Sequence, residues 1–337
     1  MNTTKKEKVR YIGSFPPPFG GVTVKNDLLF NRLSEYYNVK RIKTNRRIAQ
    51  FFWLIGSVFC HCPMIVGVSS TTGKTLLLTK LLFYFNRRTM KKTLYFMMGG
   101  VEANRISSSK KEILMYSSYK KIYVELEGMK TTVTNAGLTN VDIYPNCREP
   151  KYFKKKEHTG FRCVFFSQIS IMKGADLILL VARRHPEILF DFYGEIEQEY
   201  KAVFDEEINK LVNVNYCGVI DSRNTNVYQI LSDYDILLFP TRWKTEGVPG
   251  ILVEAKIAGV PVIASNVSYN SKIVEQDVDG LIIKDDSEEE LDKAIKKLYD
   301  RKDLLLHLSR GALNNSKRYM IDTYIDPIIK QIKEAYK

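Results

Sequence analysis

Two runs of alternating strand-like and helix-like segments restrict the fold of this chain more than any other feature. Short apolar stretches with the composition of buried strands, such as 163–167, 236–239 and 280–283, are separated by stretches with helical periodicity. Strands that alternate with helices in this way form parallel sheets covered by helices on both faces. The sequence therefore predicts an α/β fold with doubly wound sheets.

The alternation is interrupted by a polar, lysine-rich stretch at 148–160, which we interpret as an interdomain linker. At 337 residues the chain is too long for one compact core and suits two domains of ordinary size. We expect an N-terminal Rossmann-like domain at 1–155, joined by a C-terminal helix at 320–337, and a second Rossmann-like domain at 156–319. Ligands bind such sheets beyond the carboxyl ends of the strands.

The individual elements follow from periodicity and turn residues. In the first half we expect a helix at 22–36 and strands at 9–13, 64–68, 93–97, 131–135 and 141–145. In the second half we expect strands at 163–167, 189–194, 214–218, 236–239, 260–265 and 280–283, and helices at 175–184, 197–211, 224–231 and 250–258. A last helix at 324–336 is expected to be capped by Asp322 or Thr323.

Positive charge is concentrated in the first half of the chain. The net charge is +13, but residues 1–155 contain 27 Lys and Arg against 9 Asp and Glu, a net of +18, and the remainder has 24 against 29, a net of −5. Basic clusters at 41–47 and 87–92 would attract anionic lipid or a phosphorylated acceptor. Without a helix-turn-helix, RRM or zinc pattern, no nucleic acid is expected. A solvated basic face without a partner is the alternative.

The five cysteines show no paired spacing and no signal peptide precedes them, so we expect free thiols and a cytoplasmic location. Cys60-His61-Cys62 lacks zinc-finger spacing, so no metal is expected there. The apolar run 51–68 is interrupted by His61 and Pro63, which argues against a spanning helix. The stretch 40–59, basic and then apolar, fits either a membrane surface or an ordinary core helix.

The most informative segment is 239–255, in which a buried strand is followed by a loop and then by a helix that begins near Gly250. The free N–H groups at a helix N-terminus form a ready site for a diphosphate, and glycine allows its close approach. Glu246 and Glu254 flank this position. Beside an anionic diphosphate, two carboxylates are expected to contact hydroxyl groups, such as those of a ribose and a hexose.

The spacing of Glu246 and Glu254 resembles the E-x7-E motif of family 4 retaining glycosyltransferases, and the likeness continues over 246–265. The resemblance implies the GT-B fold, with two Rossmann-like domains that face each other across a cleft. It also implies that a sugar is transferred from a nucleotide donor with retention of configuration, without an obligatory metal or other cofactor.

Further segments resemble the same family. Lys173, next to Gly174, corresponds to a lysine that contacts the donor phosphate and would stabilise the leaving diphosphate. Gln168 stands where the family often has an arginine, and at 97–100 no histidine is present where the family commonly has one, so Met98 receives no catalytic role. The other donor-binding positions that the resemblance implies are Gly20, Gly21, Gly194, Gly218, Val219, Pro249, Gly250 and Ile251.

The mechanism implied by the resemblance is attack by the acceptor on the face from which the nucleotide diphosphate leaves. Glu246 would orient the donor sugar, Lys173 would stabilise the diphosphate, and a phosphate oxygen would take the proton of the acceptor. We expect a UDP- or GDP-sugar donor and a polyprenyl-diphosphate-linked saccharide acceptor in bacterial surface polysaccharide biosynthesis. The enzyme would be peripheral on the inner face of the plasma membrane.

Two other functions are compatible with the sequence, namely transfer to a soluble acceptor such as a sugar phosphate, and a non-catalytic partner subunit that kept the fold. A phosphate-binding loop at 67–75 is set aside because five residues separate its glycines instead of four, and we expect a solvated helix from Lys74. Asp233 and Asp235 precede a buried strand, which favours capping over metal binding.

Overall fold

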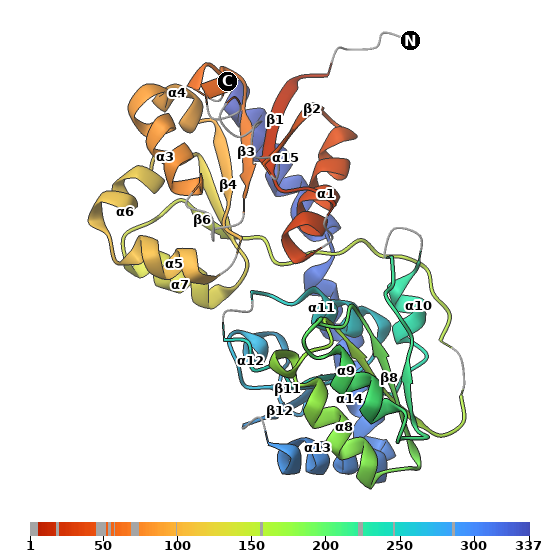
Figure 1. Cartoon of the computed structure of the whole chain (residues 1–337). Helices are drawn as coiled ribbons and strands as arrows, with labels where there is room; N and C mark the ends of the chain where they lie inside the picture. The colour runs from red at the N-terminus through yellow and green to blue at the C-terminus, as the bar shows by residue number, and fades with distance from the viewer. Residues whose placement is uncertain are drawn as a thin grey trace. The chain divides into compact units, whose positions relative to one another are not determined.

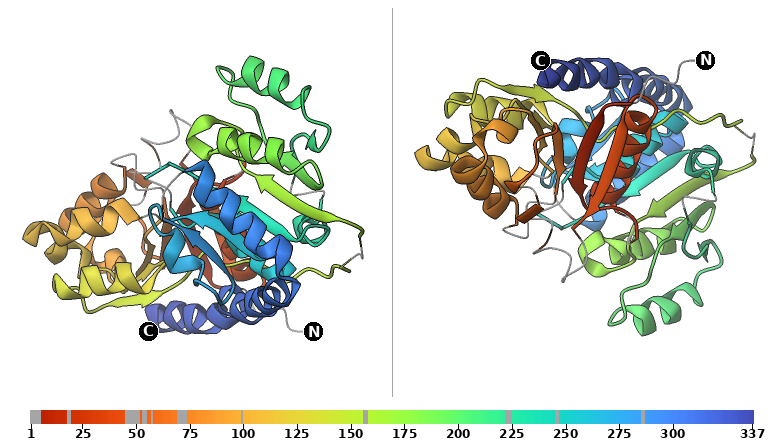
Figure 2. Two further views of the ribbon diagram at one scale, coloured as in Figure 1. Left: turned by 90° about the horizontal axis from the view of Figure 1, so that it is seen from below. Right: turned by 90° about the horizontal axis from the view of Figure 1, so that it is seen from above.

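The computed structural model describes residues 6–17, 20–44, 52, 55–56, 58–68, 74–98, 100–155, 158–221, 225–244, 247–284 and 287–337. The chain forms two compact units, Met1–Glu149 with Met320–Lys337, and Pro150–Tyr319. Each unit contains a six-stranded parallel sheet flanked by helices (Figures 1 and 2). The predicted α/β fold with doubly wound parallel sheets is therefore confirmed. The units divide between Glu149 and Pro150, whereas the boundary expected from the sequence followed residue 155.

The sheet of the first unit has the strand order β2-β1-β3-β4-β5-β6. Its strands are β1 (Lys8–Gly13), β2 (Asn38–Lys43), β3 (Met64–Gly67), β4 (Thr93–Phe96), β5 (Lys121–Val124) and β6 (Val141–Ile143). Its helices include α1 (Gly21–Ser34), α3 (Lys74–Phe85), α4 (Arg87–Met90), α5 (Gly100–Ser107), α6 (Lys110–Tyr116), α7 (Glu127–Asn135) and α15 (Asp322–Tyr336).

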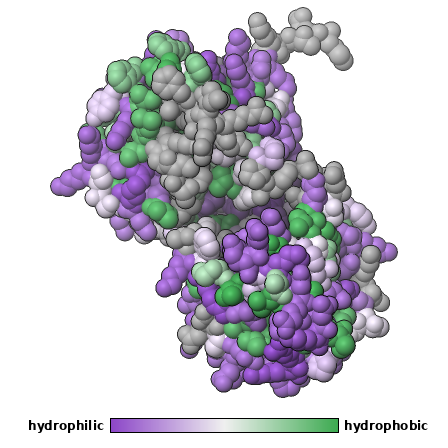
Figure 3. All heavy atoms as spheres, viewed as in Figure 1, coloured by the Kyte–Doolittle hydropathy of each residue, from purple (hydrophilic) through white to green (hydrophobic). Residues whose placement is uncertain are grey.

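The terminal helix α15 completes the core of the first unit. Its buried isoleucines recur at helical spacing, at Ile325, Ile328, Ile329 and Ile332. They pack in one cluster with residues of α1 and of the sheet, including Phe96. On the other side of this sheet lie α3, α4, α5 and α6 (Figure 1), and hydrophobic side chains also reach the surface over α3 and α4 (Figure 3).

Several expectations for the first unit are wrong. Segment 131–135 is predicted as a strand because Thr and Val favour strands, yet it belongs to helix α7. Here burial of Met129 and Val133 decides the conformation, and threonine hydroxyls such as that of Thr131 donate to carbonyls four residues back. Strands β2 and β5 are not predicted at all. In addition, α15 begins at Asp322, so neither Asp322 nor Thr323 caps it.

The sheet of the second unit has the strand order β12-β11-β10-β7-β8-β9. Its strands are β7 (Phe161–Phe166), β8 (Ile188–Tyr193), β9 (Val214–Tyr216), β10 (Ile236–Phe239), β11 (Val262–Ser265) and β12 (Gly280–Ile283). Its helices are α8 (Ala175–Arg184), α9 (Lys201–Ile208), α10 (Val227–Leu231), α11 (Gly250–Ala258), α12 (Asn270–Ile273), α13 (Glu288–Asp300) and α14 (Lys302–Ser316). Each predicted strand of this half is present, and α9 is shorter than expected because it begins at Lys201 instead of 197.

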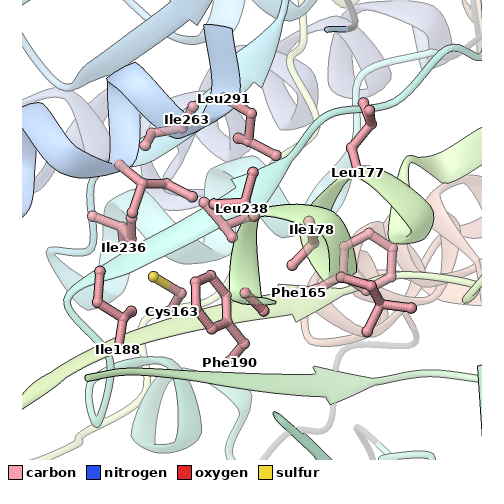
Figure 4. Packing of buried hydrophobic residues seen from close by; sticks show 14 of the residues in the cluster. Cys163, Phe165, Leu177, Ile178, Ile188, Phe190, Ile236, Leu238, Ile263 and Leu291 are labelled. Atoms are coloured by element: carbon pink, nitrogen blue, oxygen red, sulfur yellow. The ribbon is translucent and has the colours of Figure 1, made fainter. Parts of the chain in front are cut away.

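The core of the second unit forms between the middle strands and the helices α8 and α13. Figure 4 shows Cys163 and Phe165 of β7, Phe190 of β8 and Leu238 of β10 beside Ile178 of α8. All five side chains are buried. Burial of a large apolar side chain contributes roughly 1.5–3 kcal/mol, so this packing fixes the strands whose carboxyl ends carry the candidate site.

Candidate functional site

The loop after β7 carries Lys173 to the carboxyl edge of the second sheet. A 3-10 turn, η2 (Ile171–Lys173), follows the strand and leads through Gly174 into α8. Arg242, from the loop after β10, holds this turn in place. Its guanidinium donates to the carbonyl of Ile171 and, at 2.7 and 3.1 Å, to both carboxylate oxygens of Asp176. A bidentate pair of this kind fixes orientation as well as distance, so the two loops are joined with a defined geometry.

The ammonium of Lys173 is held at the surface of this edge. Its Nζ lies 5.4 Å from the centre of the Trp243 ring, within the range of a cation–π interaction. Trp243 is 44% exposed and Lys173 is half-buried. Gln168, at the start of the same loop, is exposed. The arrangement places a cation next to solvent at the end of β7, where it can reach a bound anion.

Helix α11 begins at the same edge, after β10. Pro249 occupies the cap position, and its side chain makes no capping hydrogen bond to the first N–H groups of the helix. Gly250 and Ile251 are half-buried, and so is Glu254, one turn further along the helix. Backbone N–H groups without a capping side chain, at the positive end of a helix dipole, favour an anionic group. The start of α11 is thus suited to a phosphate.

A buried ion pair joins α11 to the segment just before β12. Lys256 of this helix contacts Asp279, and neither side chain is exposed to solvent. Asp279 also accepts a bond of 2.9 Å from the backbone N–H of Glu275 and one from the amide of Asn315. Burial lowers the pKa of Lys256, and Asp279 opposes this effect. Sequence reasoning missed the pair, although a lysine in the otherwise largely apolar segment 250–258 was a signal.

Two glycines shape the loops after β8 and β9. Gly194 has φ of 142°, and its N–H donates to the carbonyl of Gly218 at 2.9 Å. A Cβ at Gly194 would lie 1.8 Å from the carbonyl oxygen of Ser167, so only glycine fits at this crossing of backbones. Gly218, with φ of 80°, has open space around it, and the next residue, Val219, is 66% exposed. The loops after β7, β8 and β9 are therefore tied together through their backbones.

A polar network around Asp191 braces the same strands. The carboxylate accepts bonds from Tyr234 at 2.7 Å, Asn215 at 2.8 Å and Arg162 at 3.2 Å. Burial and the bonds to Tyr193 and Asp191 raise the pKa of Tyr234. From the sequence, Asp191 is expected only to belong to the end of a strand. The network shows that one face of β8 carries a buried charge whose partners come from three neighbouring strands or loops.

The predicted glycine pair of the first unit lies at the start of a helix. Gly20 caps α1 and its N–H donates to the hydroxyl of Thr23 at 3.0 Å, while Gly21 is the first residue of the helix. Glu246, predicted to orient the donor sugar, lies outside the described residues, as do 69–73 of the rejected phosphate loop. Of the predicted positions, the structure brings Lys173, Gly194, Gly218, Gly250 and Glu254 to the carboxyl edge of the second sheet.

The carboxyl edge of the first sheet carries buried polar residues that sequence reasoning missed. Lys25 of α1 donates at 3.0 Å both to Glu125, which follows β5, and to the carbonyl of Tyr144. Its neighbour Asn26 donates at 2.6 Å to the carbonyl of Gly67, at the end of β3. Lys25 is buried at 1% exposure, so the pair is enclosed. These bonds fix the start of α1 to the ends of the strands.

All five cysteines are free thiols, and Sγ of Cys60 lies 3.3 Å from Sγ of Cys62. In the described residues no three His, Cys, Asp or Glu side chains form a group that could hold a metal ion. Nor does any described helix have the length and apolar character needed to cross a bilayer.

Sequence comparison finds a protein family that is similar to the second half of the chain. Residues 148–314 match the family described as "Glycosyl transferases group 1". The chain is 29% identical over 147 residues to the "Uncharacterized 41.2 kDa protein in cps region" of Klebsiella pneumoniae, covering 44% of this chain and 38% of that protein. It is 30% identical over 90 residues to the "UDP-Gal:alpha-D-GlcNAc-diphosphoundecaprenol alpha-1,3-galactosyltransferase" of Escherichia coli, covering 27% and 22%. The matches thus span well under two thirds of these relatives.

Structural comparison extends the likeness to the whole chain. The fold is similar to that of Anabaena Alr3699/HepE in complex with UDP and glucose, with a TM-score of 0.72 and 13% identity over 97% of this chain and 100% of the other. At this identity the likeness concerns the fold alone. Residues 148–314 are therefore similar to glycosyl transferases group 1 domains, and the chain has a two-domain α/β fold of the GT-B type.

Proposed function

We propose that this chain is a retaining glycosyltransferase that transfers a sugar from a UDP-sugar to a saccharide carried on polyprenyl diphosphate. The observation that carries the proposal is the convergence of the start of α11, where Pro249 provides no capping side chain, with Lys173 and Glu254 at one edge of the second sheet. The Escherichia coli relative, named for a UDP-Gal donor and a diphosphoundecaprenol acceptor, supports the choice of both substrates. The product would enter a bacterial surface polysaccharide.

The donor diphosphate would be bound by the first N–H groups of α11 and by Lys173. Both are positive, one through the helix dipole and the other through its ammonium, so they compensate the charge of the diphosphate without requiring a metal ion. The backbone around Gly218, followed by the exposed Val219, would contact the base. Glu254, which follows the phosphate position by one helical turn, would accept bonds from ribose hydroxyls.

In the transfer itself, the bond between the anomeric carbon and the phosphate oxygen breaks, and a bond from that carbon to the acceptor oxygen forms on the same face. The bonding electrons leave with UDP, and the acceptor proton passes to a phosphate oxygen. Lys173 and α11 stabilise the negative charge that grows on the leaving diphosphate, which lowers the barrier because this charge is larger in the transition state than in the substrate. Glu246 would orient the sugar.

The test combines ligand binding with transfer. UDP is expected to raise the melting temperature more than GDP does, because a ligand that binds the folded state stabilises it according to its affinity. Loss of Lys173 in Lys173→Met is expected to lower kcat by about 10²-fold, the usual cost of removing one preorganised charge donor. Lys201→Met, which removes a lysine with 60% side-chain exposure on α9, is the matched control.

The stereochemistry of the product and the role of Glu246 complete the test. Proton NMR of the product should show the same anomeric configuration as the donor. Glu246→Gln should reduce transfer strongly while UDP still raises the melting temperature. Equal background rates of donor turnover in wild type and Glu246→Gln would instead favour a non-catalytic subunit, and an inverted product would exclude the proposed mechanism.

A further inference from the structure

Helix α3 in the first unit is apolar on its outward face as well as on its inward face. Thr75, Leu78, Thr79 and Leu82 form the buried stripe. On the other side, Leu77, Tyr84 and Phe85 are exposed, Phe85 to 71%. Apart from the exposed Lys80, this outward face is apolar, and exposed apolar faces of this kind mark a contact with an apolar partner.

One exposed aromatic residue of a neighbouring segment lies beside the end of α3. This residue, Phe59, is exposed to 72%. The chain just before β3 is fastened to the junction between α3 and α4, since the amide of Asn86 donates to the carbonyls of Val58 at 2.7 Å and Cys60 at 2.8 Å. These bonds set Phe59 next to the residue that follows Phe85. Figure 3 shows the resulting group of hydrophobic side chains over α3 and α4.

Basic side chains adjoin this apolar surface. Arg87, Arg88 and Lys91 line a pocket of about 440 Å³ together with Ser118. The guanidinium of Arg87 lies 4.1 Å from the centre of the Phe83 ring, which joins the basic and apolar parts directly. All three basic residues are exposed.

We propose that this surface, formed by Phe59, Leu77, Tyr84, Phe85, Arg87, Arg88 and Lys91 and called here the α3–α4 surface, binds an anionic lipid bilayer. Its apolar side chains would enter the boundary between headgroups and acyl chains, and its pocket would receive a lipid phosphate. A second copy of this chain is disfavoured as the partner. In a symmetric contact the basic residues of both copies would lie in the same interface and repel each other. The inference deepens the proposed function, because a lipid-linked acceptor is presented at such a surface.

Cosedimentation with vesicles tests the proposal. The full-length chain is expected to bind vesicles of phosphatidylglycerol and phosphatidylcholine at 50 mM NaCl and to bind pure phosphatidylcholine vesicles much more weakly. Removing two charges in Arg87→Ser/Arg88→Ser should weaken binding about 25-fold, since one basic residue at an anionic surface contributes roughly fivefold. Removing two rings in Phe59→Ser/Phe85→Ser should weaken it at least about tenfold.

Matched controls come from the second unit. Lys293→Ser/Lys302→Ser removes the same charge from exposed positions, and Val212→Ser/Leu306→Ser removes exposed apolar side chains. Both controls should bind vesicles as the wild type does. Because all substituted side chains are exposed, the melting temperature of each variant should change little.

Three outcomes would overturn the proposal. The first is wild-type affinity in the Arg87/Arg88 and Phe59/Phe85 variants, and the second is no vesicle binding by the wild type. The third is a wild-type dimer in sedimentation velocity that dissociates on Phe59→Ser/Phe85→Ser, which would identify a second copy as the partner. A UDP-induced rise in melting temperature that persists in every variant would show that the donor site stands even if the lipid surface does not.

Discussion

The crossing of backbones at Gly194 allows a quantitative test of how the loops of the donor edge are held together. In Gly194→Ala, the new Cβ would lie 1.8 Å from the carbonyl oxygen of Ser167, and real Cβ contacts are at least 3.0 Å. The backbone at Ser167 or at residue 194 must therefore move by 1.2 Å or more. The φ of 142° adds conformational strain, because side chains rarely adopt it.

The expected loss in the free energy of unfolding is about 4 kcal/mol. Backbone strain at a position suited only to glycine contributes about 1–3 kcal/mol, and displacement of packed neighbours contributes about 1–3 kcal/mol. Gly218→Ala is the matched control, since Gly218 also has a positive φ, of 80°, but open space around its Cβ position. There the strain of about 1–2 kcal/mol is partly offset by the lower entropy of the unfolded chain.

Urea unfolding of both variants measures the difference, which we expect to be about 3 kcal/mol, with Gly194→Ala the less stable. The rise in melting temperature caused by UDP should also be smaller in Gly194→Ala, because the displaced backbone leads into the loop of Lys173. Two variants that differ by less than about 1 kcal/mol would refute the inference that close packing, and not only φ, requires glycine at this position.

Three further predictions concern buried or coupled groups. Lys256→Met should destabilise the second unit by about 3 kcal/mol in urea unfolding, because Asp279 keeps a buried charge, and Lys256→Met/Asp279→Asn should recover part of this loss; equal stabilities of the single and double variants would contradict it. Glu125→Ala should cost a similar amount by leaving Lys25 buried without its carboxylate, whereas exposed Glu127→Ala should cost less than about 0.5 kcal/mol. The bond from Cys60 and the charge of Arg10 lower the pKa of Cys62 to about 6. The rate at which iodoacetamide alkylates Cys62, which follows the thiolate fraction, should therefore be half-maximal near that pH in the wild type and at a higher pH in Cys60→Ala. Identical pH profiles of the two proteins would refute the coupling.

The strands of the second unit follow closely from local sequence patterns, whereas its helices α12, α13 and α14 were not predicted, and the first unit was predicted less well. Strands β10 and β12 and helix α11 begin and end where the apolar runs and the glycines predict. In the first unit, β2 has only two apolar residues, Val39 and Ile42, among basic ones at the edge of the sheet, and β5 has only three, at 122–124 after a lysine, so neither gives a clear pattern. Helix α7 has a strand-like composition and was wrongly predicted for that reason.

The sequence likewise identified some residues of the candidate site and missed others. Lys173 and Glu254 could be named from their motifs, because the chemistry of binding a diphosphate restricts which residues stand near each other along the chain. Asp279, Asp191 and Glu125 could not, since each becomes important only through partners far away in the sequence. A buried carboxylate is compensated in space, and no spacing along the chain records which lysine, arginine or tyrosine provides the compensation.

The sequence by itself determined the alternation of strands and helices, the excess of positive charge in the first half and the residues at the start of α11. These features depend on neighbours within a few positions, where periodicity and backbone geometry act directly. Only the tertiary structure decided which side chains of α15 enter the first core, that Gly194 must lack a side chain, and that the apolar face of α3 is exposed beside Arg87 and Arg88. Each of these results from contacts between segments remote in the chain, because burial depends on what the fold places around a residue.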